Sequence, residues 1–528
     1  MIGRATVFAA LGAGVAAAAA PQATAVFPAG APPAATASVV VSGSFPRWPV
    51  AVWTDRGQLV WTCGAEPGRF EVAVPAGGAI GIHRVRFHDA EGASAVRRFL
   101  VDPVPPRREI EPNDAPRTAM RVEPPVAIDG VIDKAGQVDC FRVDLRRGER
   151  LVAAVDGHQR LASPFDPGLD LVDDRGALVA RDLDAAGLDP RIVHVAGHDG
   201  PAVVRVFGLP ATPDSTIGLA GGESFVYRLV LATGPLLTGC APGALVAGAD
   251  APVARGIGVS AVPVEVSSIG HGPGGEPVRT ASLPGAVGLV ELPIVAGAVV
   301  EAGAWPLDVP RAMLPVEVTG CLERDGEGRG VRFAAAKGVP LQIACLARSA
   351  GSAADPVVTI FDAAGRRLHL HDSPDERFSW QPPADGDYQL VVGDRRDQGS
   401  PWHVFRVAIE PPRAAVSLTV ATDAVTGTVG KPIAVEVAIE RRHGFAERLT
   451  IAPEGLPAGV VAAAVVSPGE GDTAKKVVLE MLCHEPVSGP VRIVARRDGG
   501  PGGEPLASAA CGTERVVALW LTAVPAVP

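Results

Sequence analysis

The sequence predicts an all-β chain of tandem antiparallel β-sandwiches, and three observations lead to this fold class. Short runs rich in Val, Leu, Ile, Phe and Arg recur after the N-terminal region and alternate apolar with polar residues, as in RFEVAV, HRVRFHD and FVYRLVL. Turn-forming residues separate the runs, since 62 Gly and 50 Pro occur in 528 residues. Helical periodicity is scarce and no strand–helix–strand rhythm appears, which favours sandwiches over a doubly wound sheet.

Length and composition describe a chain that can bury several cores. A chain of 528 residues is expected to hold roughly three to five domains. It is 47% hydrophobic and 20% charged, with a mean hydropathy of +0.23, so it is not a disordered chain. The net charge of −10, without a basic stripe, argues against nucleic acid as a partner.

The N-terminus has the pattern of a secretory leader. Arg4 supplies a positive start, residues 5–20 are apolar and uncharged, and Ala-Thr-Ala at residues 23–25 matches an A-x-A cleavage site. We therefore predict a signal peptide over residues 1–25, with a disordered alanine-rich tail as the alternative.

No later segment is predicted to span a membrane. The most apolar candidate, residues 284–305, is interrupted by Glu291, Pro293 and Glu301. The mature chain is therefore expected to be secreted, periplasmic or attached to the cell surface, with no transmembrane segment.

Proline-rich joints divide the chain. They lie at residues 101–114, 306–315 and 409–414. The segment between residues 235 and 310 has weaker strand signals, and it is either a small β unit or a long connection. The predicted domains are an N-terminal Ig-like β domain (26–104), a first sandwich (109–234), the small or connecting segment (235–310), a second sandwich (311–411) and a C-terminal Ig-like β domain (412–528).

The two sandwiches are predicted to be copies of one fold. Both contain Asp-Pro, an alternating run and an Asp-x-x-Gly turn, and the strands before and after this stretch also correspond. The matching pairs are DPGLDLVDDRG (166–176) with DPVVTIFDAAG (355–365), FRVDLRRGERLVAAV (141–155) with VRFAAAKGVPLQIAC (331–345), and VYRLVL (226–231) with VFRVAI (404–409).

Each copy resembles the bacterial pre-peptidase C-terminal domain. The signs are EPND (111–114), the run from GVID to VDCFRV (130–143) and LDLVDDRG in the first copy, and PPADGDYQLVV (382–392) in the second. The resemblance implies a jelly-roll-like β-sandwich of the kind appended to secreted peptidases and large surface proteins. The chain ends resemble β domains of multidomain planctomycete-type proteins, and residues 443–460 resemble an Ig-like signature of bacterial surface proteins.

No peptidase signature accompanies these domains. HExxH is absent, the His484-Glu485 pair is followed by Pro486, and no GxSxG elbow occurs. A glycosidase-type pair of carboxylates stays open, because acidic β proteins offer many such pairs. We therefore predict that the chain is not an enzyme.

The stretch REIEPNDAPRTAM (108–120) is the strongest candidate site. Residues two apart on an extended strand point the same way, so Glu109, Glu111 and Asn113 are expected to project to one side, followed by Asp114. Carboxylate and amide oxygens are the ligands that Ca²⁺ prefers. The alternative is that Asn113 and Asp114 cap a turn while both glutamates stay in solvent.

The resemblance adds one further ligand. In calcium-binding relatives, the acidic lead-in is joined by acids of a later D-x-D-aromatic stretch, which implies Asp139 here. Gln137 stands where the family often has an acid, and Cys140 where an aromatic is common. The second copy lacks EPND, so no matching site is expected there. Ca²⁺ is the only cofactor that the sequence suggests.

Three other groups of residues have a structural interpretation as well as a functional one. Trp48, Trp53 and Trp61 are either a sugar-binding platform or core aromatics, and the latter is favoured. His369 and His371 are either metal ligands or a solvent-facing pair. An acidic cluster could hold calcium, although its central aspartates suit a turn; it comprises Asp170, Asp173, Asp174, Asp182 and Asp184.

The seven cysteines contain no CxxC, which argues against structural zinc. Most are expected to be buried small hydrophobes, although a disulfide between Cys321 and Cys345 stays open.

These observations together predict a secreted or surface-attached, non-catalytic protein for binding, adhesion or spacing, whose partner is an extracellular protein or a polysaccharide. Two alternatives remain: an accessory or targeting component of a secreted peptidase or hydrolase system, and a hydrolase with an unrecognised site.

Overall fold

The structure is a computed structural model that describes residues 19–77, 80–184, 187–210, 218–272, 276–347, 352–373, 377–498 and 505–526. Regular structure in these residues is almost entirely β-strand, and their one α-helix is the four-residue α1 (His158–Leu161). The predicted all-β fold class is confirmed. Within these residues, no helix is long and apolar enough to cross a membrane.

The first domain packs two sheets around a phenylalanine-rich core that includes Phe70, Phe87 and Phe99. The sheet orders are β1 (Gln22–Phe27), β3 (Thr36–Ser44), β6 (Arg69–Ala73), β5 (Val60–Cys63), and β2 (Gly30–Ala31), β9 (Arg97–Val101), β7 (Gly81–Asp89), β4 (Ala51–Thr54), with β8 (Gly92–Ala93) beside β7.

The predicted leader over residues 1–25 overlaps this domain. The strand β1 begins at Gln22, pairs with β3, and buries Ala23 and Ala25. Cleavage after Ala25 would remove four of the six residues of β1, so the predicted boundary at residue 25 conflicts with the fold, and a leader would have to end before Gln22. The alternating apolar residues of this strand extend into the A-x-A pattern. The local sequence therefore does not distinguish a cleavage site from the start of a strand.

The first sandwich follows and contains two five-stranded sheets. Its core includes the fully buried Phe141, Leu169 and Tyr227. The strand order in one sheet is β10 (Pro106–Arg108), β12 (Val126–Val131), β19 (Val226–Ala232), β14 (Arg150–Asp156), β17 (Arg191–Val195). The order in the other sheet is β11 (Met120–Arg121), β13 (Val138–Leu145), β18 (Gly200–Leu209), β15 (Asp166–Val172), β16 (Leu178–Asp182).

The second sandwich repeats this strand order. In both copies a short entry strand joins each sheet by parallel pairing, and the remaining pairs are antiparallel. The strand order in one sheet is β27 (Ala298–Glu301), β30 (Val316–Cys321), β37 (Val404–Glu410), β32 (Leu341–Leu346), β35 (Arg377–Trp380). The order in the other sheet is β28 (Gly303–Ala304), β31 (Arg329–Ala335), β36 (Gly386–Asp394), β33 (Pro356–Asp362), β34 (Arg367–His371), with β29 (Arg311–Ala312) beside β31.

The segment before the second sandwich is a small β unit with its own core, built around Leu237, Cys240, Ala281 and Leu292. Its strands are β20 (Leu236–Ala241) paired with β22 (Val253–Ile257), and β21 (Leu245–Val246), β26 (Val290–Val295), β25 (Pro277–Ser282), β23 (Glu265–Val266), with β24 (Gly270–His271) beside β25. Because β27 already belongs to the second sandwich, that sandwich begins near Ala298 and not at residue 311 as predicted.

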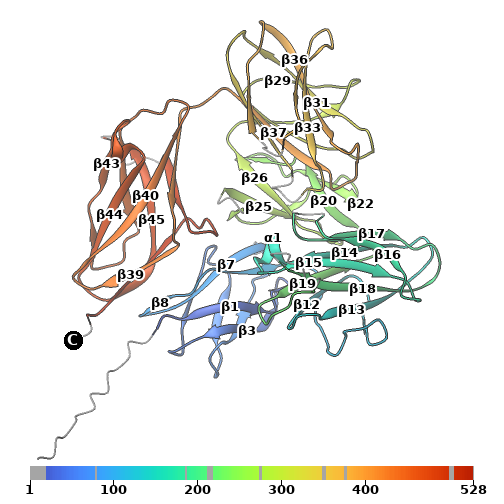
Figure 1. Cartoon of the computed structure of the whole chain (residues 1–528), viewed down its shortest axis with the longest axis horizontal. Coiled ribbons are helices and arrows are strands. Elements are labelled where there is room, and N and C mark those ends of the chain that lie inside the picture. The colour runs from blue at the N-terminus through green and yellow to red at the C-terminus, as the bar shows by residue number, and fades with distance from the viewer. Residues whose placement is uncertain are drawn as a thin grey trace, which may run out of the picture.

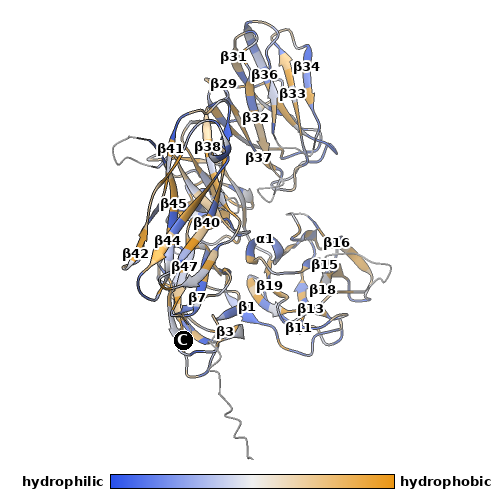
Figure 2. Ribbon diagram, turned by 60° about the vertical axis from the view of Figure 1, so that its left-hand side comes forward, coloured by the Kyte–Doolittle hydropathy of each residue, from blue (hydrophilic) through white to orange (hydrophobic). Residues whose placement is uncertain are grey.

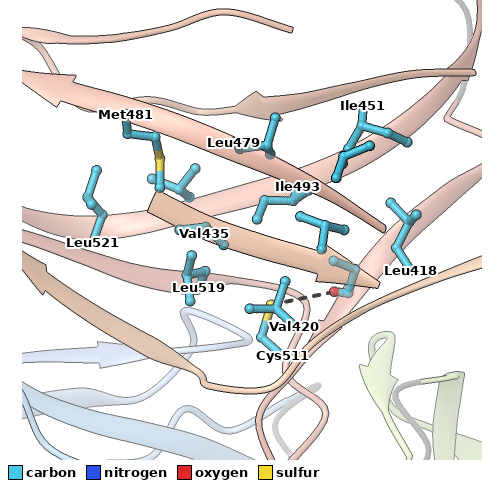
Figure 3. Close-up of a cluster of buried hydrophobic side chains, with 14 of the residues drawn as sticks. Leu418, Val420, Val435, Ile451, Leu479, Met481, Ile493, Cys511, Leu519 and Leu521 are labelled. Atoms are coloured by element: carbon cyan, nitrogen blue, oxygen red, sulfur yellow. Dashed lines mark hydrogen bonds between the residues drawn. The ribbon is translucent and has the colours of Figure 1, made fainter. Parts of the chain in front are cut away.

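The last domain encloses the apolar core drawn in Figure 3, where Leu418, Val435 and Leu479 point between the strands. Its strand over Pro432–Arg442 alternates buried and exposed residues, as expected for a two-layer fold. The strands are β38 (Ala415–Val420), β39 (Ala424–Thr428), β40 (Pro432–Arg442), β41 (Leu449–Glu454), β42 (Val460–Ala462), β43 (Val465–Ser467), β44 (Lys476–Cys483), β45 (Val487–Arg497), β46 (Ala507–Cys511) and β47 (Leu519–Val524).

The chain curls so that its first and last domains lie side by side, as both Figure 1 and Figure 2 show. The strand β8 of the first domain contacts β47 of the last, and Trp520 packs against His88 with ring centroids 4.5 Å apart. Arg255 of the small β unit forms ion pairs of 2.8 Å with Glu301 and Glu323 of the second sandwich. Contacts thus join the first domain to the last, and the small β unit to the second sandwich.

Candidate metal centre

Both sheets of the first sandwich contribute to the candidate metal centre. The backbone leaves β10 beside β12, and the Glu109 N–H donates to the carbonyl of Asp129 at 3.0 Å. Glu111 follows two residues later, whereas Asp139 lies on β13 of the opposite sheet. The entry segment therefore brings two glutamates to an aspartate that is distant in the sequence.

Three carboxylates meet at this place. Carboxylate oxygens of Glu109, Glu111 and Asp139 all lie within 4.8 Å of one another. Asp139 is fully buried, Glu109 is half-buried and Glu111 is exposed. The group is thus open to solvent on one side and anchored in the core on the other.

A buried tyrosine lies beneath the carboxylates. The Tyr227 hydroxyl is 2.7 Å from Asp139 Oδ2 and 3.0 Å from Glu109 Oε2. Gly130 allows this close packing, because a Cβ there would lie 2.3 Å from the tyrosine hydroxyl oxygen. A hydroxyl has one proton, so it can donate to only one of the two oxygens. The other contact requires a proton on the carboxyl group when no cation is bound.

Other hydrogen bonds orient the two glutamates. The Val131 N–H donates to Glu109 Oε1 at 2.7 Å, and the Asn113 N–H donates to Glu111 Oε2 at 2.8 Å. The Gln137 amide donates to Glu111 Oε1 at 2.6 Å. Gln137 thus occupies the place at which the sequence resemblance suggested an acid, and it orients the Glu111 carboxylate instead of adding a charge.

Burial of these acids raises their pKa values. Loss of solvent is the main cause for both, and it raises the pKa of Glu109 to about 7. The charge of Glu109 adds to desolvation at Asp139, whose pKa rises to about 9. Like charges held together in a partly dry site favour either a shared proton or a bound cation.

Two buried polar groups at this end of the sandwich lack partners among the described residues. Asp139 Oδ1 has no hydrogen bond, although the residue is fully buried, and neither amide atom of fully buried Asn113 has one. Buried polar atoms are normally satisfied by protein, water or an ion. An all-oxygen set of three carboxylates with an unsatisfied buried oxygen fits a hard divalent cation such as Ca²⁺.

The structure brings together three of the five predicted ligands. Asp114 is exposed and lies outside the group. Asn113 contacts the site through its backbone, since its carbonyl accepts the Cys140 N–H at 3.0 Å. The alternative in which the Asn113 side chain caps a turn is wrong, because that side chain makes no hydrogen bond within the described residues.

The second sandwich shows what the fold itself requires at these positions. Strand registers place Gly320 and Phe405 where the first copy has Gly130 and Tyr227. In the same way Ala302 replaces Glu109, since its N–H donates to the corresponding carbonyl of Thr319. The equivalent of Asp139 is Arg329. The fold therefore forms without the carboxylates, and they are an addition specific to the first copy.

Sequence reasoning missed Tyr227 as part of this site. The repeat aligns Tyr227 of VYRLVL with Phe405 of VFRVAI, and core packing alone explains two aromatic residues at equivalent positions. The available signal was the difference between these two residues, because the hydroxyl occurs in the copy that carries the acids.

The other candidates have structural roles. Trp48 and Trp61 pack edge-on against Phe70, and Trp53 packs against Trp520 of the last domain. The His369 and His371 rings lie on one side of β34, 6.4 Å apart, and both pack against Phe378. No third carboxylate, cysteine or histidine joins them among the described residues.

The second acidic cluster is dispersed. Asp170 pairs with Arg181 at 2.7 Å, and Asp173 accepts turn N–H groups. Cys321 and Cys345 are not joined by a disulfide, and six of the seven cysteines are buried.

Comparison with known proteins adds little beyond the fold. No protein-family model and no curated protein matches the chain. Among solved structures, the M60 catalytic domain of Clostridium perfringens ZmpB with its CBM51-1 and CBM51-2 domains is 12% identical, with a TM-score of 0.14, and the alignment covers 71% of this chain and 44% of that one. The chain thus spans less than half the length of this structure.

Two further matches are composed of β domains. The fibronectin(III)-like modules of Clostridium thermocellum CbhA are 9% identical over 42% of this chain and 94% of theirs, with a TM-score of 0.14. The N-terminal four Ig domains of Dscam1 isoform 7.44 are 10% identical over 96% of this chain and 100% of theirs, with a TM-score of 0.21. At this similarity the matches carry no argument about function.

Proposed function

We propose that this chain is a secreted or cell-surface, non-catalytic β-sandwich protein for binding, adhesion or spacing, whose first sandwich holds a Ca²⁺ ion. In this proposal both sandwiches are pre-peptidase C-terminal domains, and Glu109, Glu111 and Asp139 are the calcium ligands. The observation that carries it is the carboxylate group within 4.8 Å, which includes a buried aspartate oxygen without a partner.

The position of the ion suggests its purpose. Glu109 and Glu111 lie just after β10, the entry strand of the first sandwich, which follows the last strand of the first domain closely, and Asp139 lies in the opposite sheet. A cation bound to all three ties the entry segment to both sheets. It would stiffen the joint between two domains, which suits a protein that spaces or presents its other modules.

The hydrolase alternative has one geometric argument. Ser400 Oγ lies 2.7 Å from His403 Nδ1, as a nucleophile and its base would. However, Ser400 Oγ also accepts the Trp402 N–H at 3.2 Å, and only 7% of His403 is exposed. The pair therefore closes a turn, which supports the non-catalytic proposal.

Thermal melting with calcium and with chelator tests the proposal. A ligand that binds only the folded state raises its stability, so ~1 mM Ca²⁺ should raise the melting temperature of the wild-type chain. Glu109→Gln and Asp139→Asn should abolish the rise, whereas Asp114→Asn, which alters an exposed neighbour outside the group, should retain it. An unchanged melt in the wild type would refute the calcium site.

A further inference from the structure

One face of the second sandwich carries an exposed aromatic residue between basic side chains. This face, here called the Trp305 face, is the outer side of the sheet β28–β31–β36–β33–β34. On β33, Val358 and Ile360 are buried in the core, so Thr359 and Phe361 point outward. The Trp305 face comprises Trp305, Arg332, Thr359, Phe361, Arg367 and Gln389.

Strand register sets the order of these residues. Phe361 pairs with Arg367 on one side and with Gln389 on the other, and Gln389 pairs in turn with Arg332. Neighbouring strands are about 4.8 Å apart, so both arginines lie within roughly 10 Å of Phe361 across the sheet. The face thus has an aromatic centre with a cation on either side.

Trp305 is held firmly but is not covered. Its ring stacks on Phe361 with centroids 5.3 Å apart and planes 18° from parallel. The backbone N–H of Trp305 donates to the carbonyl of Gly328 at 3.0 Å, and the backbone N–H of Asp308 donates to the carbonyl of Ala304 at 2.8 Å, which closes the following turn. Even so, 39% of Trp305 remains exposed. A rigid indole open to solvent can receive a ligand without ordering cost.

The charge of this face is opposite to that of the whole protein. Arg311 and Asp387 neutralise each other through an ion pair of 2.7 Å, which leaves two exposed cations, Arg332 and Arg367, and one exposed carboxylate, Asp308. Arg332 is oriented by its Nε–H, which donates to the carbonyl of Val309 at 2.9 Å. In a chain of net charge −10, this local excess of positive charge favours an anionic ligand.

We propose that the Trp305 face binds an acidic polysaccharide. A pyranose ring stacks its apolar face on the Trp305 indole, Gln389 and Thr359 offer hydrogen bonds to hydroxyl groups, and uronate carboxylates pair with Arg332 and Arg367. This inference names the ligand class of the binding role proposed above and rests on it.

The first sandwich lacks this arrangement, which identifies the face as a feature of one copy. Val172 and Val203 replace Phe361 and Gln389 there, and they join the small buried cluster around Cys140. The face of the second sandwich therefore exceeds what the shared fold needs.

Two exposed apolar residues point to an alternative ligand for this region, an apolar protein partner. Leu307 is 92% exposed and Met313 is 86% exposed, and both belong to the segment that follows Trp305. They would suit an apolar protein partner, but they carry neither charge nor hydrogen bonds. The acidic polysaccharide is favoured because the residues centred on Phe361 combine an aromatic ring with cations and polar groups.

Affinity electrophoresis of the full chain provides the test, with polygalacturonate as the acidic probe and dextran as the neutral one. We expect retardation by polygalacturonate that weakens with added salt, and none by dextran. Trp305→Ala and Arg367→Gln should each weaken binding about tenfold. Arg142→Gln, at the position of the first sandwich that corresponds to Arg332, should leave it unchanged. Trp305→Phe keeps an aromatic ring stacked on Phe361. This variant is the control that distinguishes loss of the binding site from loss of folding.

Three results would overturn the inference: no retardation by polygalacturonate, equal retardation by dextran, or full binding by a folded Trp305→Ala variant. A second assay uses cell-envelope polysaccharide from which protease has removed the protein. It distinguishes failure of the inference about the Trp305 face from failure of the proposed binding role. If Trp305→Ala binds this material as the wild type does, the Trp305 face is wrong while the binding role stands. If the wild type binds neither treated nor untreated envelopes, the binding role itself is wrong.

Discussion

The Arg86 guanidinium of the first domain and the Asp423 carboxylate of the last domain form an ion pair, with 2.8 Å between Nη2 and Oδ2. Only 1% of the Arg86 side chain is exposed, and its Nη1 donates to the Ser94 carbonyl at 2.9 Å. Burial lowers the pKa of Arg86, and the charge of Asp423 counters this effect. The contact holds together residues 337 positions apart and closes the curled chain.

Asp423→Ala should separate the first domain from the last domain. The change leaves a buried cation without its partner, which costs about 3 kcal/mol in the unfolding free energy of the coupled domains. The radius of gyration from small-angle scattering should rise as the end domains separate. Arg47→Ala, which removes the more exposed Arg47–Glu91 pair, should cost less than about 1 kcal/mol. An unchanged radius of gyration for Asp423→Ala would contradict the closed arrangement.

A second buried network joins the first domain to the first sandwich. The fully buried Arg228 pairs with Asp129 at 2.6 Å and with Asp102 at 2.8 Å, and Asp129 also accepts the Ala29 N–H at 3.0 Å. Arg228→Met should destabilise the chain by about 3–5 kcal/mol in urea unfolding, because two carboxylates lose their cation. Combining it with Asp102→Asn and Asp129→Asn should restore part of the loss, since no charge then remains buried. Equal stability of the single and triple variants would refute this account of the joint.

Stability without calcium should depend on pH. The folded-state pKa values of Glu109 and Asp139 are raised, so the folded chain binds more protons than the unfolded one. Their contribution is therefore fully present below the unfolded values near pH 4 and is lost as pH rises through about 7 and about 9. In the proposed site calcium takes the place of these protons, so its stabilising effect should grow over the same range of pH. Melts in chelator that do not fall as pH rises would contradict the close approach of these acids in the structure. The matched control Asp114→Asn should show the same fall as the wild type.

Tyr227→Phe should weaken calcium binding without unfolding the sandwich. Phe405 fills the equivalent position of the second copy, so the aromatic packing is preserved. Loss of the hydroxyl removes the hydrogen bond to Asp139, which costs about 1–2 kcal/mol of stability. Tyr388→Phe, in the second sandwich, is the control and should leave the calcium-induced shift in melting temperature unchanged. Equal shifts in both variants would exclude Tyr227 from the site.

The sheets were predictable because their signal is local. A strand with one buried face alternates apolar and polar residues, as β40 does over Pro432–Arg442, and the two repeated sandwiches show the same succession of strands. The boundary of the second sandwich was not predictable in this way. Its entry strand β27 precedes the proline-rich stretch at 306–315, which has the composition of a linker but lies within the domain.

The site was predictable only in part. The i, i+2 spacing of Glu109 and Glu111 is visible in the sequence, whereas their meeting with Asp139 depends on how the sheets pack. Asp114 has the same chemistry as these acids, yet the chain turns it to solvent. Contacts such as Arg86 with Asp423 join separate domains, and no local pattern encodes them.

Isothermal titration of Ca²⁺ into the chelator-treated full chain at about pH 7.5 tests the central claim most directly. One binding event per chain is predicted for the wild type, because in the part of the chain that the structure describes only the first sandwich groups three such carboxylates, and none is predicted for Glu109→Gln. No binding heat for the wild type, or undiminished binding by the folded Glu109→Gln variant, would contradict the account.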